Sequence, residues 1–318
     1  MYRFLVERLS LGLLTVAGLT ILVFFVMRVL PGDPLVVMFG REESFDLRPQ
    51  DREKLIQSLG LDRPLVAQYV SWVGGLLHGR MGKSFWRERD IGHLVARRGP
   101  VTAEIAVGAI LVAWLIGLPA GAFSAIKFNT PGDYLVRIGA VVSFAVPNFW
   151  LALLVLLLLV TTNVWVPPLI YVPIWSNPWQ NLQMILLPSL VLGAGLAGYY
   201  SRMVRSQVLE VLRQDYVRTA RAKGLPSWQV LTRHIMRTAL IPVITLSSVS
   251  IASLLGGSVI IETIFNIPGL GRTLYQGFLE KDFLVVQNMV LLSGIAFIVA
   301  NLVIDILYGW LDPRIRVS

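Results

Sequence analysis

Apolar residues in this chain occur in runs long enough to cross a membrane, and charged residues gather between the runs. A helix needs about 20 apolar residues to cross ~30 Å of hydrocarbon. The pattern therefore predicts an all-α membrane protein with six transmembrane helices. The expected spans are residues 9–30, 101–126, 135–162, 183–204, 238–261 and 283–308.

Two spans are required between residues 138 and 201, because this region carries no charged side chain and is too long for one helix. Proline and amide residues between 163 and 183 mark the turn that separates them. The first run exceeds the ~7–15 apolar residues of a cleaved signal peptide, so we expect a retained anchor. Kinks are expected at the prolines that fall inside or beside spans, which are Pro119, Pro147, Pro188 and Pro242.

Lysine and arginine are distributed unevenly over the short connections. With the N-terminus placed in the cytoplasm, 14 of them lie in the cytoplasmic segments and two in the short loops opposite. Because cytoplasmic loops retain basic residues, this imbalance predicts that both termini are cytoplasmic. The chain then divides into a first helix with an extracytoplasmic stretch (1–100), a core of five spans (101–310) and a cytoplasmic tail (311–318).

The composition agrees with a membrane protein and excludes several other classes. Of 318 residues, 55% are hydrophobic and 15% are charged, and this excess of apolar residues excludes disorder and a free-standing soluble enzyme. There is no cysteine, so disulfides, thiolate metal sites and a cysteine nucleophile are excluded. The net charge of +9 is better explained by basic residues on the cytoplasmic side of a membrane than by nucleic acid.

Polar residues within the expected spans are few. The carboxylates Glu104, Glu262 and Asp305 lie near span ends, and we expect each to be an interfacial helix-end charge. A self-powered secondary carrier usually places carboxylates near mid-membrane, so this pattern weighs against one. Candidates for lining a translocation path, each explained at least as well by helix packing, are Asn148, Tyr199, Tyr200 and Asn288.

Small residues recur every four positions in the second expected span, at Ala113, Gly117, Gly121 and Ala125. Such a stripe lets another helix backbone approach closely. It serves either packing inside the bundle or a seam with another subunit, and packing inside the bundle is favoured.

The segment between the fourth and fifth spans, residues 206–235, predicts two short helices outside the membrane. Apolar residues at three- and four-residue intervals predict an amphipathic helix. Gly224 can adopt the left-handed conformation that ends a helix, Pro226 disfavours its continuation, and Ser227 is positioned to cap a second helix. Composition alone leaves two interpretations open. The segment is either a helix that lies on anionic lipid or a helix that another protein binds and moves.

Blocks of sequence along the whole chain resemble the membrane-spanning permeases of binding-protein-dependent ABC importers, specifically the dipeptide, oligopeptide and nickel branch. No single block is specific, but together and in order they identify the chain as similar to this family. The blocks are LPGDP (30–34), LGLDRP (59–64), DYVRTARAKGL (215–225), RH (233–234), IP (241–242), ETIF (262–265), PGLGR (268–272), NLVID (301–305) and LDPRIR (311–316).

The resemblance implies a type I importer permease fold, in which 206–235 is a coupling loop seated on an ATPase subunit. Arg218 stands where the general importer pattern has Glu, and the downstream proline expected near Arg237 is missing; both departures are typical of the peptide branch. They put in doubt any salt bridge assigned to that Glu in other importers. The implied contact residues are Glu210, Asp215, Tyr216, Arg218, Thr219, Ala220, Ala222, Lys223 and Gly224.

The resemblance also implies the partners and the location. These are a second homologous permease, two cytoplasmic ATP-binding subunits that carry ATP and Mg²⁺, and an extracytoplasmic binding protein, all at a prokaryotic inner or plasma membrane. This chain is expected to be non-catalytic and to bind no cofactor or metal, since it has no nucleophile motif and its three histidines lack ligand spacing. Peptides are the first choice of solute, with nickel chelates, oligosaccharides or opines as alternatives.

Overall fold

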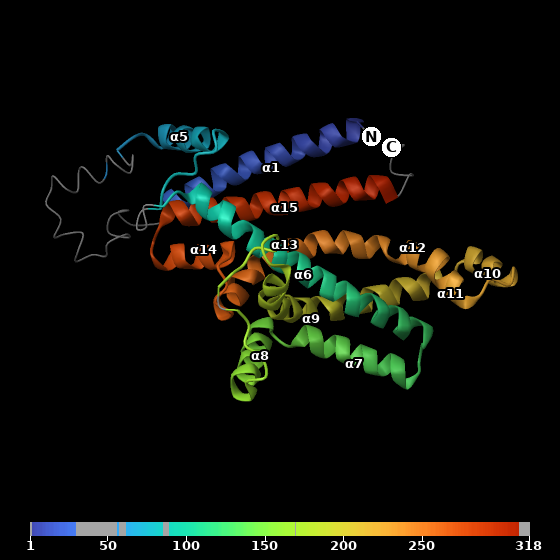
Figure 1. Cartoon of the computed structure of the whole chain (residues 1–318). Helices are drawn as coiled ribbons and strands as arrows, with labels where there is room; N and C mark the ends of the chain where they lie inside the picture. The colour runs from blue at the N-terminus through green and yellow to red at the C-terminus, as the bar shows by residue number, and fades with distance from the viewer. Residues whose placement is uncertain (1, 30–55, 57–61, 85–88, 169, 312–318) are drawn as a thin grey trace.

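The computed structural model describes residues 2–29, 56, 62–84, 89–168 and 170–311, and in these ranges the protein is helical apart from connections and one isolated bridge between Lys83 and Asp90. Figure 1 shows the helices in chain order. Their bounds are α1 (Tyr2–Val29), α5 (Leu65–Leu77), α6 (Ile91–Ile126), α7 (Pro131–Ala145), α8 (Asn148–Thr162), α9 (Pro178–Val211), α10 (Asp215–Ala222), α11 (Ser227–Gln229), the π-helix η1 (Val230–Ile235), α12 (Met236–Ala239), α13 (Ile241–Ile264), α14 (Leu270–Leu279) and α15 (Phe283–Leu311).

The two longest helices, α6 and α9, pack against each other at the centre of the bundle. A Cβ atom at Gly117 would lie 2.7 Å from the carbonyl oxygen of Ala197, and one at Gly121 would lie 2.4 Å from that of Ser201. Glycine is therefore required for this approach. The small-residue stripe serves packing inside the bundle, as predicted.

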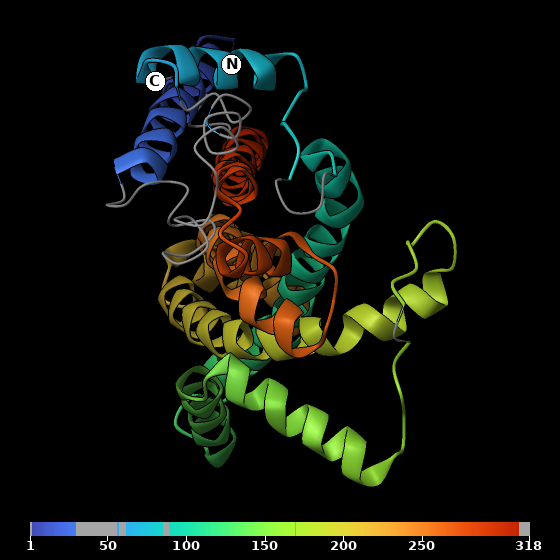
Figure 2. The ribbon, with the colours of Figure 1, turned by 90° about the vertical axis from the view of Figure 1, so that its left-hand side faces the viewer.

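The remaining long helices surround this pair. α1 and α15 lie side by side along one edge of the bundle, and α13 lies between α15 and α9 (Figures 1 and 2). Both α1 and α15 are mostly apolar in sequence, which suits a position at the edge of a bundle in a membrane. α5 packs on the end of α1, where Tyr69 and Trp72 contact the ring of Phe24.

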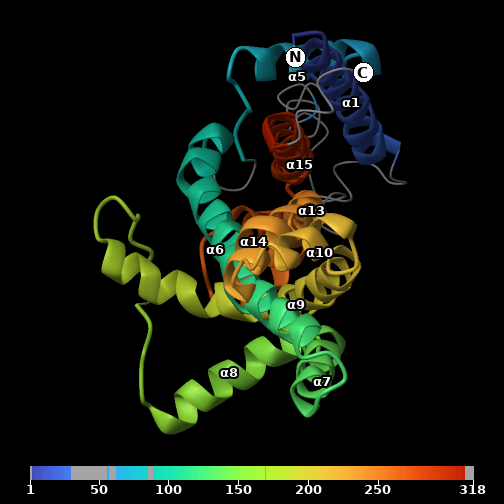
Figure 3. The ribbon, with the colours of Figure 1, turned by 90° about the vertical axis from the view of Figure 1, so that its right-hand side faces the viewer.

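The third expected span, 135–162, is not one helix. α7 and α8 meet at an angle of 95° across Val146 and Pro147. Proline lacks a backbone donor and disfavours the helical conformation of the residue before it, and Val146 is extended, with φ −76° and ψ 121°. A kink was expected here, but the sequence did not predict a right angle. α8 consequently points sideways out of the bundle (Figures 2 and 3).

Four described helices are long and apolar enough to cross a membrane, and six spans result if each of two bent helix pairs is counted as one. The second bent pair joins Ser227–Ala239 to Ile241–Ile251 at 45°. The helix that contains the second expected span, α6, begins at Ile91, ten residues before the expected start of that span, and Pro119 and Pro188 lie inside continuous helices. A multi-pass membrane protein follows, while the count of six and the orientation stay predictions.

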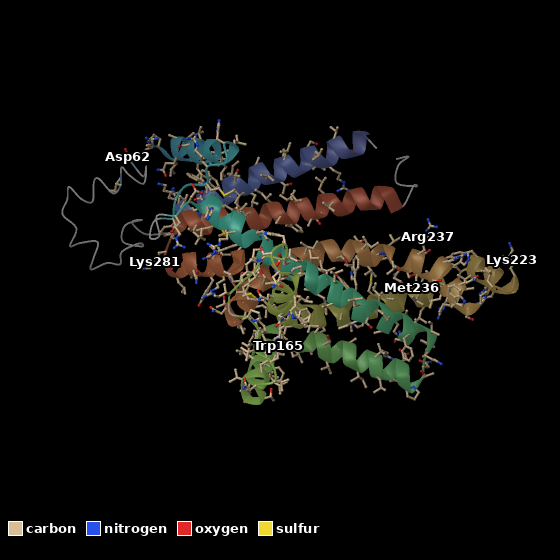
Figure 4. All side chains as sticks on the ribbon, viewed as in Figure 1. Asp62, Trp165, Lys223, Met236, Arg237 and Lys281 are labelled. Atoms are coloured by element: carbon tan, nitrogen blue, oxygen red, sulfur yellow. The ribbon has the colours of Figure 1, made fainter. Side chains whose placement is uncertain are left out.

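The segments predicted to be cytoplasmic gather at one end of the bundle. The start of α1, the end of α15, the connection between α6 and α7, and helices α10 and α11 share that end, whereas α5 and α14 lie at the other (Figure 1). Figure 4 shows Lys223 at the first end and Asp62 and Lys281 at the second. Most of the stretch 31–61 and the tail 312–318 lie outside the described residues.

Candidate functional site

The segment expected to be a coupling loop, residues 206–235 and called the coupling segment below, folds onto the end of α9 as a compact unit. It comprises the last turns of α9, all of α10 and α11, and the π-helix η1. α9 continues to Val211 and α10 begins at Asp215, so the amphipathic helix expected to end at Gly224 is divided in two. Its first part extends α9, and its second part is α10. The buried side chains that join these parts in one apolar cluster are Val208, Val211, Val217, Ala220, Val230 and Ile235.

The turn after α10 is built around Gly224. Its φ is +75°, the left-handed conformation predicted from the sequence. The N–H of Gly224 donates to the carbonyl of Arg221 at 2.9 Å, and that of Leu225 donates to Ala220 at 3.4 Å, which is the Schellman pattern of a helix end. Ser227 does not cap the next helix. Pro226 occupies the N-cap position, Ser227 is the first residue of the helix, and no side chain makes a capping hydrogen bond there.

Eight of the nine expected contact residues are exposed on this segment, and Ala220 alone among them is buried. Asp215 and Arg218 form an ion pair at 3.4 Å with side chains 95% and 74% exposed, so the pair contributes little to stability. The hydroxyl of Thr219 donates to the carbonyl of Asp215 at 3.0 Å. α10 therefore presents a polar outer surface, with Tyr216 44% exposed, while Val217 and Ala220 on its inner face join the apolar cluster and α10 packs against η1.

A cavity of about 420 Å³ lies where the break between α7 and α8 faces α9 and α13. Asn148, the first residue of α8, and Tyr199 of α9 both line it. Three further polar side chains on its wall, Ser143, Ser250 and Ser253, gave no signal in the sequence, because serine within an apolar helix is common. Among the described residues, the lining carries hydroxyl and amide groups and no charged side chain.

The other two candidate path residues lie elsewhere. Tyr200 is wholly buried, and its hydroxyl donates to Ser250 Oγ at 2.9 Å from behind the cavity wall. Asn288 is buried on α15, where its Nδ2 donates to the carbonyls of Leu284 and Met81 at 2.7 and 3.1 Å. The structure thus brings Asn148 and Tyr199 to one cavity and leaves Tyr200 and Asn288 outside it.

The carboxylate of Glu262 lies in the last turn of α13, near a helix end as expected, but it is enclosed by protein, which the sequence did not predict. It is fully buried and accepts from Thr102 Oγ1 and from the backbone N–H of Arg272, both at 2.7 Å. Thr102 in turn accepts from the N–H of Leu270 at 2.8 Å. These bonds fasten the first turn of α14 to α6 and α13. The side chain of Asp305 lies outside the described residues.

Glu104 fastens a second connection, the loop between α8 and α9. It accepts from the hydroxyl of Tyr171 at 3.0 Å and from Nδ2 of Asn181 at 2.7 Å. Burial and this carboxylate raise the pKa of Tyr171 well above its ordinary value, so the hydroxyl remains a donor even at a pH where a free tyrosine would ionise. Within the ranges described, no group of three His, Asp or Glu residues could hold a metal ion.

Comparison with known proteins agrees with this architecture. Residues 117–317 match the family described as binding-protein-dependent transport system inner membrane component, and residues 1–106 match the N-terminal part of the same kind of membrane component. The chain therefore belongs to this family of transport permeases, which is a family of non-catalytic membrane subunits.

Full-length relatives carry the comparison further. The chain is 37% identical to a di/tripeptide transport system permease of Pseudomonas aeruginosa, with 99% of each chain covered. It is 34% identical to an oligopeptide transport system permease of Bacillus subtilis, covering 99% of this chain and 100% of that one. It is also 34% identical to the dipeptide transport system permease of Escherichia coli K12, with 99% of each covered.

Proposed function

We propose that this chain is one of two membrane-spanning subunits of an ATP-driven importer for di- and oligopeptides. The observation that carries the proposal is the full-length similarity to relatives named as peptide transport permeases. The second permease would be a homologue of this chain, and an extracytoplasmic binding protein would deliver the solute. The assembly would lie in the inner or plasma membrane of a prokaryote, with both termini of this chain in the cytoplasm.

ATP is hydrolysed, in this proposal, by two cytoplasmic subunits that hold ATP and Mg²⁺, while this chain binds neither. Closure of the ATPase pair moves the two coupling segments together and opens the bundle outward, and hydrolysis resets it. ATP shifts this equilibrium only through contacts that differ between the two states. The exposed outer surface of α10, with Asp215, Tyr216 and Arg218, supports a role as that contact.

The solute path would include the cavity beside Asn148 and Tyr199. Its hydroxyl and amide groups match the amide N–H and C=O groups of a peptide backbone, which need hydrogen-bond partners when they leave water. A lining whose described residues carry no charge suits solutes with varied side chains, because it neither attracts nor repels one charge type. The second permease would complete the wall on the open side of the cavity.

The test is uptake by proteoliposomes that contain both permeases and both ATPase subunits. Peptide uptake should require ATP on the side of the membrane where the ATPase subunits lie. It should also require the loaded binding protein on the opposite side. The ligand that co-purifies with the binding protein decides between peptides and the alternatives, which are nickel chelates, oligosaccharides and opines. Solute transport by the purified single chain, driven by an ion gradient, would refute the proposal in favour of a secondary carrier.

A further inference from the structure

A buried ion pair joins α7 to α9 immediately before the coupling segment. Arg205 donates from Nε to Oδ1 of Asp133 at 2.8 Å and from Nη2 to Oδ2 at 2.9 Å. The side chain of Asp133 is 0% exposed and that of Arg205 is 19% exposed. Two parallel hydrogen bonds between a guanidinium and a carboxylate fix both the separation and the orientation of the partners.

The same carboxylate also holds α6 and the connection between α6 and α7. Asp133 accepts from the hydroxyl of Ser124 on α6 and from the backbone N–H of Asn129 at 3.1 Å. The guanidinium of Arg205 lies over the ring of Phe128, 5.4 Å from its centroid. One carboxylate and one guanidinium therefore fasten three helices at the end of the bundle that carries the coupling segment (Figure 1).

From this pair, close packing of α7 on α9 continues to the cavity. A Cβ atom at Gly198 would lie 2.6 Å from the carbonyl oxygen of Ala140, and the hydroxyl of Ser143 donates to the carbonyl of Ala194. α7 then ends at the break before Asn148, which lines the cavity. A displacement of α9 at its cytoplasmic end must carry α7, and so the break, with it.

Stability alone does not explain an ion pair at this position. A buried pair gains little over well-packed apolar residues, because both charges lose their hydration. Its value lies in fixing one arrangement of its partners rather than several. The pair sits where the apolar cluster of the coupling segment, built on Val208 and Val211, meets the rest of the bundle.

We propose that the Asp133–Arg205 pair is the strut through which movement of the coupling segment reaches the cavity wall. Asp133 and Arg205 are positioning residues in this assignment: they touch neither ATP nor solute. The inference rests on the proposed function, because it presumes that force enters at the coupling segment. Without the strut, movement of the cytoplasmic end of α9 would reach α7 only through the contacts at Gly198 and Ser143, and Asn148 would follow α9 less completely.

The test compares the reconstituted importer carrying Asp133→Asn, Arg205→Met or both with the unmodified importer. Each single change leaves a buried group without its partner and should lower the melting temperature. The double change should cost less than the sum of the two single changes, because it leaves no buried charge unpaired and the methionine fills the space of the arginine stem. It does not restore the full stability, because the amide of Asp133→Asn has one acceptor oxygen where Ser124 and the N–H of Asn129 now use two. The ratio of solute transported to ATP hydrolysed should nevertheless fall about fivefold or more in the double variant. A factor of about five is the lower end of the range by which one site ordinarily changes the affinity of another.

A matched control separates coupling from stability. Ile105 is a fully buried residue of α6 in a different apolar cluster, and Ile105→Ala should lower the melting temperature while leaving transport per ATP unchanged. A double variant with normal transport per ATP would overturn the strut, as would a control that is equally uncoupled. If the unmodified importer moves solute without ATP, the proposed function itself fails, and this outcome is visible before any variant is made.

Discussion

The backbone conformation of Gly224 offers a sharp test of the coupling segment. With φ at +75°, an L-residue there costs about 1–2 kcal/mol. A Cβ atom at this position would meet nothing within 4 Å, so the cost is conformational and not steric. The equilibrium constant between this turn and other backbone conformations would shift by a factor of about 5–30 toward the others. Such a shift changes the orientation of α10 relative to its partner.

The expected order of effects follows from this conformation. Gly224→Asn should be close to the unmodified protein, because asparagine tolerates the left-handed region, while Gly224→Ala and then Gly224→Val should be progressively worse. The assay is ATP hydrolysis by the reconstituted importer, with and without loaded binding protein. Gly224→Val should lose most of the stimulation while membrane insertion stays normal.

The matched control is Gly18→Val, which adds the same side chain within a right-handed helix where a Cβ also meets nothing within 4 Å. It should leave the stimulation of ATP hydrolysis intact. The reasoning is refuted by a Gly224→Val importer with normal stimulated turnover. It is equally refuted by a Gly224→Asn importer as impaired as Gly224→Val, because then the left-handed conformation would not be the cause.

Three further predictions concern the polar contacts. Gly269→Ala places a Cβ 2.4 Å from a carboxylate oxygen of Glu262 and should destabilise the protein by about 1–3 kcal/mol, measured by thermal unfolding in detergent, where an unchanged melting temperature would contradict it. Tyr200→Phe removes the bond to Ser250 and should cost about 1 kcal/mol in the same measurement, with Tyr134→Phe, on an exposed tyrosine, as the neutral control. Because the pKa of Tyr171 is raised in the folded protein, the protonated hydroxyl contributes fully to stability below about pH 10, and this contribution is lost as the pH rises further. Above about pH 10, the melting temperature should therefore fall less steeply with pH in Tyr171→Phe than in the unmodified protein.

Several elements could be predicted from the sequence because one local cause determines each of them. The apolar runs locate the long helices, the stripe at Gly117 and Gly121 predicts close packing, and Gly224 before Pro226 predicts the turn after α10. In each of these cases the residue type restricts the backbone directly. The conformation at Gly224 and the packing of the stripe are both confirmed.

Other features depend on contacts between distant parts of the chain. The angle at Pro147 is set by what α7 and α8 pack against, and proline alone specifies only that the helix is interrupted. The burial of Glu262 could not be predicted, because its partners Thr102 and Arg272 come from other elements. The bond between Asp133 and Arg205 joins residues 72 positions apart, so no local pattern could reveal it.

The interruption at Val146 and Pro147 has a consequence for hydration. Where a helix stops, its last carbonyls and the first N–H groups of the next helix have no intrahelical partners. In hydrocarbon such groups are tolerated only against protein or a water-filled space. The cavity lies beside this interruption, so water is expected to enter it and to bond to the bare main chain. A polar solute arriving there would exchange one set of hydrogen bonds for another and would never have to shed them all at once.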